Sequence, residues 1–259
     1  MNVDNSNYFS REAEMEYFGT SQIKAFEKCE AKALATIKGE WQTPMTTALL
    51  VGSYVDAHFE GTLDDFLNEH PECFKRDGSL KVDYRMADDI IARIESDELF
   101  MEYMAGEKQV VKTGEIDGYK FKIKMDSYHE GDKIVDLKVM RTMDRVMGKS
   151  FVEYWNYFLQ GAIYQQIEGN NLPFYLAVAT KEDPCDIAIV ELEQDDMDAS
   201  LEEVRPNLAR WLAIKKGEIE PEGCGKCDYC RATKKLTEPI SSDLVGFSNK
   251  ELKAMKGDY

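Results

Sequence analysis

Long hydrophobic runs are absent from this sequence, and none approaches the roughly 18 apolar residues that a membrane span requires. The first residues are acidic and polar, whereas a secretory signal has a basic start and an apolar stretch. Internal repeats, low-complexity tracts and long linkers are also lacking, so nothing marks a domain boundary. We therefore expect a soluble, cytoplasmic protein without a membrane partner.

Positive charge is scarce as well. The 259 residues include 32 Lys and Arg against 49 Asp and Glu, which gives a net charge of −17. Such a surface does not bind nucleic acid as a whole, because phosphate contacts need Lys and Arg. A local basic groove is compatible with this total, since net charge governs solubility and non-specific association. With 43% hydrophobic residues, the chain is globular and forms one large or two small domains.

Hydrophobic periodicity predicts an α/β fold with a central mixed sheet of about five strands flanked by helices. Spacings near 3.6 residues predict helices, and alternation of apolar with polar residues predicts strands. The expected helices cover residues 21–39, 45–61, 84–104, 150–169 and 198–216. The expected strands cover 108–116, 119–126, 133–139, 174–180 and 185–193. Asp117-Gly118 is a strong hairpin signal between the first two strands.

Two of these strands bring carboxylates together. The two-residue period places Asp126 on one face of its strand, and Asp136 and Lys138 on one face of the next. A short turn joins the two strands as antiparallel neighbours, so we expect the three side chains to converge. Paired carboxylates bind a hard cation such as Mg²⁺, and a nearby lysine can orient water or balance developing charge. The alternative is a solvated strand face with a surface ion pair.

Four motifs occur in the order found in RecB-like nucleases. Asp126, Asp136 and Lys138 form a D-x9-D-x-K pattern that resembles the PD-(D/E)XK nuclease superfamily. Three further segments are similar to the opening helix, the histidine-bearing helix and the Q-x-x-x-Y motif of its RecB-like branch: Thr20–Cys29, Gly52–His58 and Gln160–Tyr164. The matches extend over roughly residues 20–230 and look most like the phage exonuclease VIII (RecE-like) exodeoxyribonucleases.

This resemblance implies a restriction-endonuclease-like fold and a role for each matched residue. Asp126 and Asp136 would bind Mg²⁺ or Mn²⁺, assisted by His58, and Lys138 would activate water or stabilise the phosphate. Taken alone, a histidine on an apolar helix face is more often a core residue. Gln160 and Tyr164 would orient the substrate.

Two further assignments concern neighbouring strand residues. Some family members add a glutamate ligand, for which Glu115 is the candidate. Lys120, Lys122 and Lys124 share the strand face of Asp126 and would bind DNA phosphates, although exposed lysines are usually only solvated. These lysines would supply the local basic surface that the net charge seems to deny.

The implied activity is exonucleolytic digestion of duplex DNA ends, with 5′-to-3′ polarity, for phage-type homologous recombination in the cytoplasm of a bacterial host. A RecT-like single-strand annealing protein would be the partner, and the enzyme would be a homo-oligomer. No Walker phosphate loop is present, so ATP-driven unwinding is not expected. One alternative is an iron–sulfur nuclease of the CRISPR-associated or AddB type that cuts single strands. The others are a catalytically silent DNA-binding module and a zinc-stabilised scaffold.

Three of the six cysteines crowd into a C-x2-C-x2-C motif at Cys224, Cys227 and Cys230. Closely spaced cysteines in an intracellular protein indicate a metal site rather than disulfides. Cys29 is the natural fourth ligand, in a layout similar to the [4Fe–4S] sites of RecB-like nucleases. The last interval is shorter than in those relatives, and Zn²⁺ or an empty, reduced site is the alternative.

These motifs also predict the domain limits. We expect an N-terminal extension over residues 1–19 and a nuclease domain over 20–235, which includes the cysteine motif at 224–230. A polar tail would follow over 236–259.

Overall fold

The computed structural model describes residues 1–236, 239 and 241–256, and its contacts divide the chain into two compact units. The sheet unit comprises Met1–Tyr8 and Pro44–Glu203. The cysteine unit comprises Phe9–Thr43 and the described part of Val204–Tyr259. The predicted domain limits stay a prediction. Within the predicted tail, 237, 238, 240 and 257–259 lie outside the described residues.

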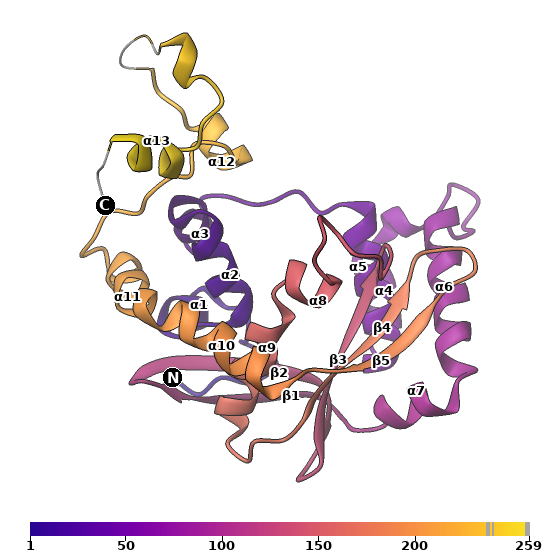
Figure 1. The fold of residues 1–259 in the computed structure, drawn as a ribbon. Coiled ribbons are helices and arrows are strands. Elements are labelled where there is room, and N and C mark those ends of the chain that lie inside the picture. Colours follow the sequence, from indigo (N-terminus) through magenta and orange to yellow (C-terminus); the bar gives the residue numbers. More distant parts are fainter. Residues whose placement is uncertain (237–238, 240, 257–259) are drawn as a thin grey trace. The chain divides into compact units, whose positions relative to one another are not determined.

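A five-stranded mixed sheet forms the centre of the sheet unit, which confirms the predicted fold (Figure 1). Its strands lie in the order β1 (Glu107–Ile116), β2 (Tyr119–His129), β3 (Lys133–Met140), β4 (Phe174–Thr180) and β5 (Ile187–Glu191). Neighbouring strands are antiparallel except β3 and β4, which are parallel. Asp117 and Gly118 have φ angles of 52° and 78°, the positive values that the two central positions of a type I′ hairpin turn require.

Helices cover both faces of this sheet. On one face, α4 contacts β3 and α6 contacts β4, and they share a core with the odd-numbered Val135 and Ala177. On the other face lies α9, whose Tyr164 ring is 5.6 Å from the ring of the even-numbered Phe174. The helices of this unit are α4 (Thr47–Glu60), α5 (Leu63–Glu69), η1 (Pro71–Cys73), α6 (Val82–Glu95), α7 (Glu98–Tyr103), α8 (Phe151–Tyr154), α9 (Tyr157–Glu168) and α10 (Gln194–Val204), which ends at the unit boundary.

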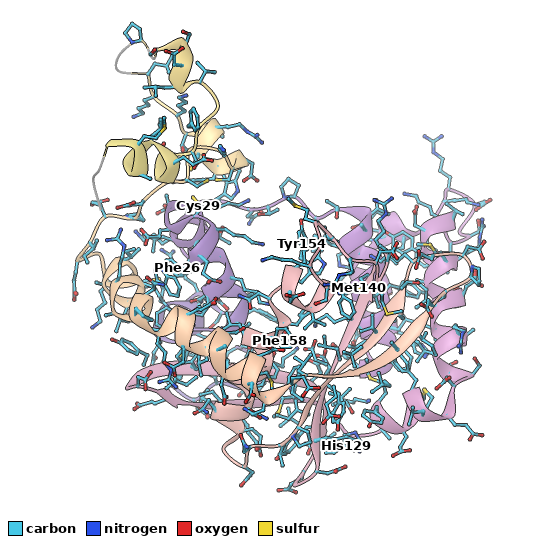
Figure 2. The ribbon with its side chains drawn as sticks, viewed as in Figure 1. Phe26, Cys29, His129, Met140, Tyr154 and Phe158 are labelled. Atoms are coloured by element: carbon cyan, nitrogen blue, oxygen red, sulfur yellow. The ribbon has the colours of Figure 1, made fainter. Side chains whose placement is uncertain are left out.

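The cysteine unit is built from helices of two distant chain segments. These helices are α1 (Arg11–Glu16), α2 (Thr20–Lys28), α3 (Glu30–Ile37), η2 (Arg205–Asn207), α11 (Leu208–Lys216), α12 (Asp228–Ala232), η3 (Ser242–Leu244) and α13 (Asn249–Lys256). Phe26 of α2, labelled in Figure 2, stacks on Trp211 of α11 with 5.7 Å between ring centroids. Arg210 makes two 2.8 Å hydrogen bonds to Glu30, so a bidentate ion pair also joins α11 to α3.

Four of the five predicted helices are interrupted, because periodicity cannot show a local break. Cys29 is extended (φ −168°, ψ 105°) and separates α2 from α3. Asp97 accepts a hydrogen bond from the Phe100 N–H and so starts α7 anew after α6. Asn156 is left-handed between α8 and α9, and η2, which contains a proline, separates α10 from α11. None of the described helices has the length and apolar character needed to cross a bilayer.

Candidate active site

Asp126 lies where two strands of the sheet unit separate. β2 and β3 pair only over Ser127–His129 and Lys133–Val135. Beyond that point Asp126 Oδ2 accepts a 3.0 Å hydrogen bond from the Leu137 N–H, so a carboxylate takes the place of a strand carbonyl. Its Oδ1 accepts a 3.2 Å bond from Gln109 Nε2, and Gln109 has a positive φ of 55°. The opening of the sheet therefore holds the half-buried Asp126 carboxylate between the two strands.

Asp136 and Lys138 reach this opening from β3, as the two-residue period predicts. They form an ion pair, and the Asp136 side chain is buried while that of Lys138 is 22% exposed. Gln160 of α9 donates a 2.6 Å hydrogen bond from Nε2 to Asp136 Oδ1. Burial lowers the pKa of Lys138, but the adjacent Asp136 and Asp126 carboxylates raise it above its ordinary value. Lys138 is therefore an ammonium at neutral pH.

Helix α4 adds two carboxylates that the sequence motifs did not indicate. Asp56 and Glu60 are four residues apart, so they share a helix face. Together with Gln109, Asp126 and Leu137 they line a cavity of about 10 Å³, which has room for about one water molecule. The signal available in the sequence was this i, i+4 acidic pair, which starts within the matched motif Gly52–His58.

The environment of these carboxylates disfavours their charged forms. Burial raises the pKa of Asp56 well above its ordinary value, and the charge of Asp126 adds to the effect. Burial and the neighbouring Asp136 raise the pKa of Asp126 to about 7, against the opposing effect of Lys138. Burial also raises the pKa of Glu60. A divalent cation offsets this repulsion, because it supplies the positive charge that the carboxylates lack.

His58 is not brought to this centre. Its Nε2 lies 2.8 Å from Glu95 Oε1, and its side chain is 32% exposed. Asp56 and His58 are two residues apart on an α-helix, which places them roughly 200° apart around the axis. The same helix therefore presents Asp56, rather than His58, to Asp126.

Glu115 is also remote from the centre. It is exposed and pairs with Lys120 at the hairpin end of β1 and β2. Lys120 is six residues from Asp126 along β2, about 20 Å at a rise of 3.4 Å per residue. Glu115 is therefore too distant to share a metal ion with Asp126.

The predicted basic strand face is only partly exposed. Lys122 is 1% exposed, its ammonium lies 4.5 Å from the centroid of the Tyr8 ring, and it donates to the Tyr8 carbonyl. Because the N-terminal segment covers this residue, Lys122 cannot contact DNA phosphates, and its assignment as a DNA-binding residue is corrected. Lys120 is exposed and Lys124 is half-buried.

The Q-x-x-x-Y segment packs closely against the sheet. Tyr164 donates a 2.9 Å hydrogen bond from its hydroxyl to the Lys124 carbonyl, so it supports β2 rather than Asp136. Gly161 follows Gln160 in the sequence, and neighbouring side chains leave no room for a Cβ at this position. A Cβ there would come within 2.5 Å of Met197 Sδ and 3.3 Å of the Phe174 ring. Glycine thus allows α9 to approach the sheet, which brings Gln160 to Asp136.

The cysteine unit brings its four predicted ligands into one cluster. The Sγ atoms of Cys29, Cys224, Cys227 and Cys230 all lie within 4.8 Å of one another. Cys29 Sγ is 3.6 Å from Cys230 Sγ and 3.8 Å from Cys227 Sγ. Backbone N–H groups donate to three of these sulfurs; Cys224 Sγ accepts from Lys226 at 3.4 Å and from Cys227 at 3.3 Å.

This cluster is suited to a cation. Burial alone would raise the pKa of the Cys224 thiol, but the two backbone N–H bonds lower it to about 7. Burial and the neighbouring thiols raise the pKa of Cys230 to about 12. Four thiolates at these distances repel one another unless a metal ion lies among them. The donor set therefore fits a metal site, and Cys73 and Cys185 are free thiols elsewhere.

The family model of a PDDEXK-like domain of unknown function (DUF3799) matches residues 19–233. The chain belongs to this family. It is 45% identical to a crystal structure from Eubacterium rectale described as a "putative exonuclease", with a TM-score of 0.90 over 95% of this chain and 99% of that chain. The crystal structure of SSO0001 is 14% identical over 85% of this chain and 96% of that chain, with a TM-score of 0.34. No curated protein matches the chain.

The PDDEXK-like assignment agrees with the chemistry of the acidic centre. Asp126, Asp136 and Lys138 lie on two strands that open beside helix α4. The carboxyl oxygens are ligands that hard divalent cations prefer, and a paired ammonium lies beside them. Such a centre can hydrolyse a phosphodiester.

Proposed function

We propose that this PDDEXK-like protein is a Mg²⁺- or Mn²⁺-dependent exodeoxyribonuclease. The observation that carries the proposal is the convergence of Asp56, Asp126, Asp136 and Lys138 at the point where β2 and β3 separate. A solvated strand face does not explain it, because Asp136 is 3% exposed and the pKa values of Asp56 and Asp126 are raised by burial.

The chain's own residues divide the work as follows. Asp56, Asp126 and Asp136 would hold the metal ion, which when bound polarises the phosphate and lowers the pKa of a water ligand. Gln160 holds the Asp136 carboxylate in position through its 2.6 Å hydrogen bond. Lys138 presents its ammonium beside Asp136, where it orients the attacking water and balances the charge that develops on the phosphate.

The polarity and setting of the reaction rest on the resemblance to RecE-like exonucleases. We infer 5′-to-3′ digestion of double-stranded DNA ends in the cytoplasm of a bacterial host, for phage-type recombination. The enzyme would act as a homo-oligomer and pass its single-stranded product to a RecT-like annealing protein. The description of the Eubacterium rectale relative as an exonuclease supports the exonucleolytic class.

Linear duplex DNA labelled at one 5′ or 3′ end tests the proposal. We expect the 5′ label to be released as mononucleotide with Mg²⁺ or Mn²⁺, and no release with EDTA. Asp136→Asn should abolish release, because the position then lacks a charged ligand. Equal activity of wild type and Asp136→Asn would overturn the site. Preferential digestion of single strands would favour the CRISPR-associated or AddB type.

For the four cysteines we propose a single Zn²⁺ ion in place of the [4Fe–4S] cluster expected from the resemblance. A tetrahedral ion with Zn–S bonds of about 2.3 Å separates its sulfurs by about 3.8 Å. Three of the six Sγ–Sγ separations are 3.6 Å, 3.8 Å and 4.0 Å, close to that value, and all six lie within 4.8 Å. A four-iron cluster spaces the thiolates further apart, because iron and sulfide atoms fill the centre. The ion would be structural, since four protein ligands leave no open position.

A further inference from the structure

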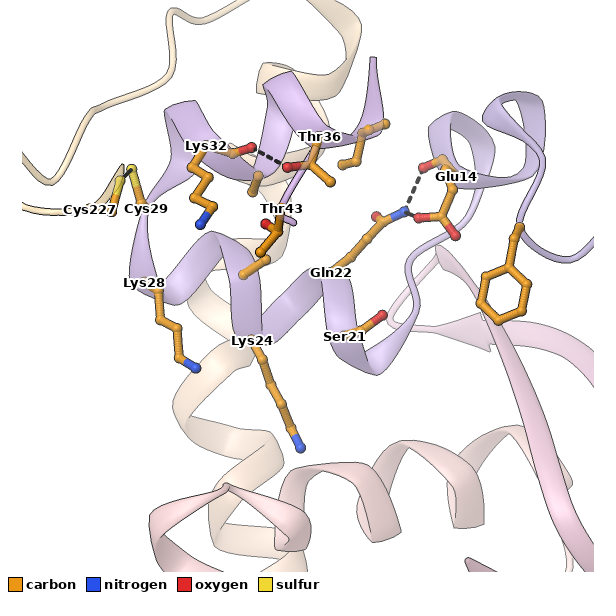
Figure 3. A pocket seen from close by; sticks show the side chains of 14 residues that line it. Glu14, Ser21, Gln22, Lys24, Lys28, Cys29, Lys32, Thr36, Thr43 and Cys227 are labelled. Atoms are coloured by element: carbon orange, nitrogen blue, oxygen red, sulfur yellow. Dashed lines mark hydrogen bonds between the residues drawn. The ribbon is translucent and has the colours of Figure 1, made fainter. Parts of the chain in front are cut away.

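The cysteine unit contains a hollow of about 720 Å³ that the acidic centre does not use (Figure 3). It lies along α2 and α3, and the cysteine cluster borders it through Cys29 and Cys227. Its volume is typical of a small-molecule or nucleotide site rather than of a groove for a duplex.

Lysines form its polar rim. Lys24, Lys28 and Lys32 are spaced four residues apart and all line the hollow (Figure 3). Among the lining residues the only acidic one is Glu14, which accepts a hydrogen bond from Gln22 Nε2. Lys32 also contacts Asp228 at 2.6 Å and is 27% exposed. In a chain with a net charge of −17, an excess of positive charge around one cavity sets this surface apart from the average.

Apolar residues form the floor of the hollow. Ala25, Ala33 and Ile37 line it, and so does Phe9, which has 73% of its surface exposed. Lysines and an exposed aromatic ring in one hollow are the combination that binds single-stranded nucleic acids, since each base stacks on a ring while the backbone meets ammonium groups. A metabolite site would not require an aromatic residue in this exposed position.

We propose that this hollow binds single-stranded DNA. Lys24 and Lys28 would contact consecutive phosphates, Phe9 would stack on a base, and the apolar floor would accommodate roughly one or two nucleotides. The proposal deepens the proposed nuclease function and rests on it, because exonucleolytic digestion of a duplex exposes a single strand. Its site is separate from the acidic centre, since every lining residue belongs to the cysteine unit.

Fluorescence anisotropy of a labelled oligothymidine, measured in EDTA to prevent cleavage, tests the proposal. The Lys24→Gln/Lys28→Gln variant should weaken binding at least tenfold and lower the slope of log Kd against log salt by about 1.4, at about 0.7 per lost phosphate contact. The matched control is Lys75→Gln/Arg76→Gln, which removes two exposed charges from the sheet unit and should change neither value. Equal binding by wild type and the Lys24/Lys28 variant would overturn the proposal.

Phe9→Ala provides a second variant that changes no charge. Loss of stacking should weaken oligothymidine binding roughly tenfold and leave the salt slope unchanged. This variant also keeps the test decisive if the lysine variant fails to fold. Competition by thymidine monophosphate at the same concentration of nucleotide would overturn the proposal in favour of a mononucleotide site.

Duplex digestion measured in parallel separates the two proposals. If the wild type digests duplex DNA but the lysine and Phe9 variants bind oligothymidine as well as the wild type does, only the single-strand binding site in the hollow is overturned. If oligothymidine binding depends on Lys24, Lys28 and Phe9 but the protein digests no DNA, the proposed nuclease function is overturned and the binding site in the hollow is supported.

Discussion

Gln160 Nε2 donates a 2.6 Å hydrogen bond to Asp136 Oδ1, and both side chains are more than nine-tenths buried. The bond leaves Asp136 Oδ2 to the Lys138 ammonium. Because the amide comes from α9 and the carboxylate from β3, the orientation of a candidate metal ligand depends on the packing of a helix against the sheet.

Removal of this amide should impair metal binding more than folding. Gln160→Ala should raise the Mg²⁺ concentration needed for half-maximal DNA cleavage by roughly 10- to 100-fold. A loss of this size is typical when an outer hydrogen-bond partner of a metal ligand is removed. The measurement is cleavage rate against Mg²⁺ concentration. Gln166→Ala is the control, since Gln166 is an exposed glutamine of the same helix. An unchanged Mg²⁺ titration for Gln160→Ala would contradict the assigned role.

Substitutions of Asp56 and His58, both in helix α4, should affect the cleavage rate very differently. Asp56→Asn should lower the rate of cleavage by at least about 10²-fold, because it removes a charged ligand from the buried centre. His58→Ala should leave activity within about twofold, because His58 contacts Glu95 away from the centre. Steady-state rates at saturating Mg²⁺ decide between them. A larger loss of activity in His58→Ala than in Asp56→Asn would support His58 as the metal ligand, as the family motif suggests.

Stability should depend on pH through the half-buried carboxylates of Asp56 and Asp126. The folded-state pKa values of Asp56 and Asp126 lie above the value of about 3.9 for an unfolded Asp, so folding takes up protons. The contribution of Asp126 is lost as pH rises from about 4 through about 7, and that of Asp56 is likewise lost as pH rises through its own raised pKa. In EDTA we expect a lower melting temperature at pH 8 than at pH 6.

Mg²⁺ should raise the melting temperature more at pH 8 than at pH 6, because protons compete with the metal for the carboxylates. Asp126→Asn should melt higher than wild type in EDTA at pH 8 and lose most of the Mg²⁺ shift. Differential scanning fluorimetry measures all of these values. A Mg²⁺ shift of equal size at both pH values would argue against metal binding by these groups.

Replacement of glycine by alanine should have opposite effects on stability in α9 and in α4. Gly161→Ala should destabilise the protein by about 1–3 kcal/mol and reduce cleavage, because its Cβ meets Met197 and Phe174. Gly52→Ala in α4 should instead stabilise by about 0.5–1 kcal/mol, because no heavy atom lies within 4 Å of its Cβ position and alanine favours a helix. Urea unfolding measures both. Equal effects would show that α9 does not need the glycine.

The cysteine cluster should lose its metal when one ligand is replaced. Elemental analysis of the wild type should give about one zinc per chain and no iron. Cys29→Ser should lose the zinc and melt at a lower temperature, whereas Cys73→Ser should retain it, because Cys73 is buried in the sheet unit. A brown protein with about four irons per chain would instead support the cluster.

Much of the fold could be predicted from the sequence because sheet periodicity is local. The two-residue period of β2 and β3 is visible in the chain, and it placed Asp126 near Asp136 and Lys138. The hairpin at Asp117-Gly118 follows from two adjacent residues that accept positive φ angles. Where one face of a strand is buried, a register error would expose the core, so local pattern and tertiary structure agree.

The incorrect predictions concern residues whose environment is determined by distant parts of the chain. Lys122 reads as exposed in its strand, yet the N-terminal Tyr8 covers it. Helical periodicity alone cannot show which of Asp56 and His58 faces a strand 70 residues or more away, and the motif favoured the histidine. The extended conformation of Cys29 divides the predicted helix into α2 and α3. The sequence does not reveal this break, because both helices bury apolar residues and the helical pattern continues across it.

The two units differ in when they can be completed on the ribosome. The sheet unit has all of its residues once Glu203 has been synthesised, so the acidic centre can assemble early. Cys29 is separated from Cys224 by 195 positions, which take roughly 10 to 40 s to translate. During that time its thiol has none of the three partners from Cys224–Cys230. Capture of the proposed zinc ion would therefore be a late event in the biogenesis of this protein, because its fourfold site is complete only after Cys230 has been synthesised.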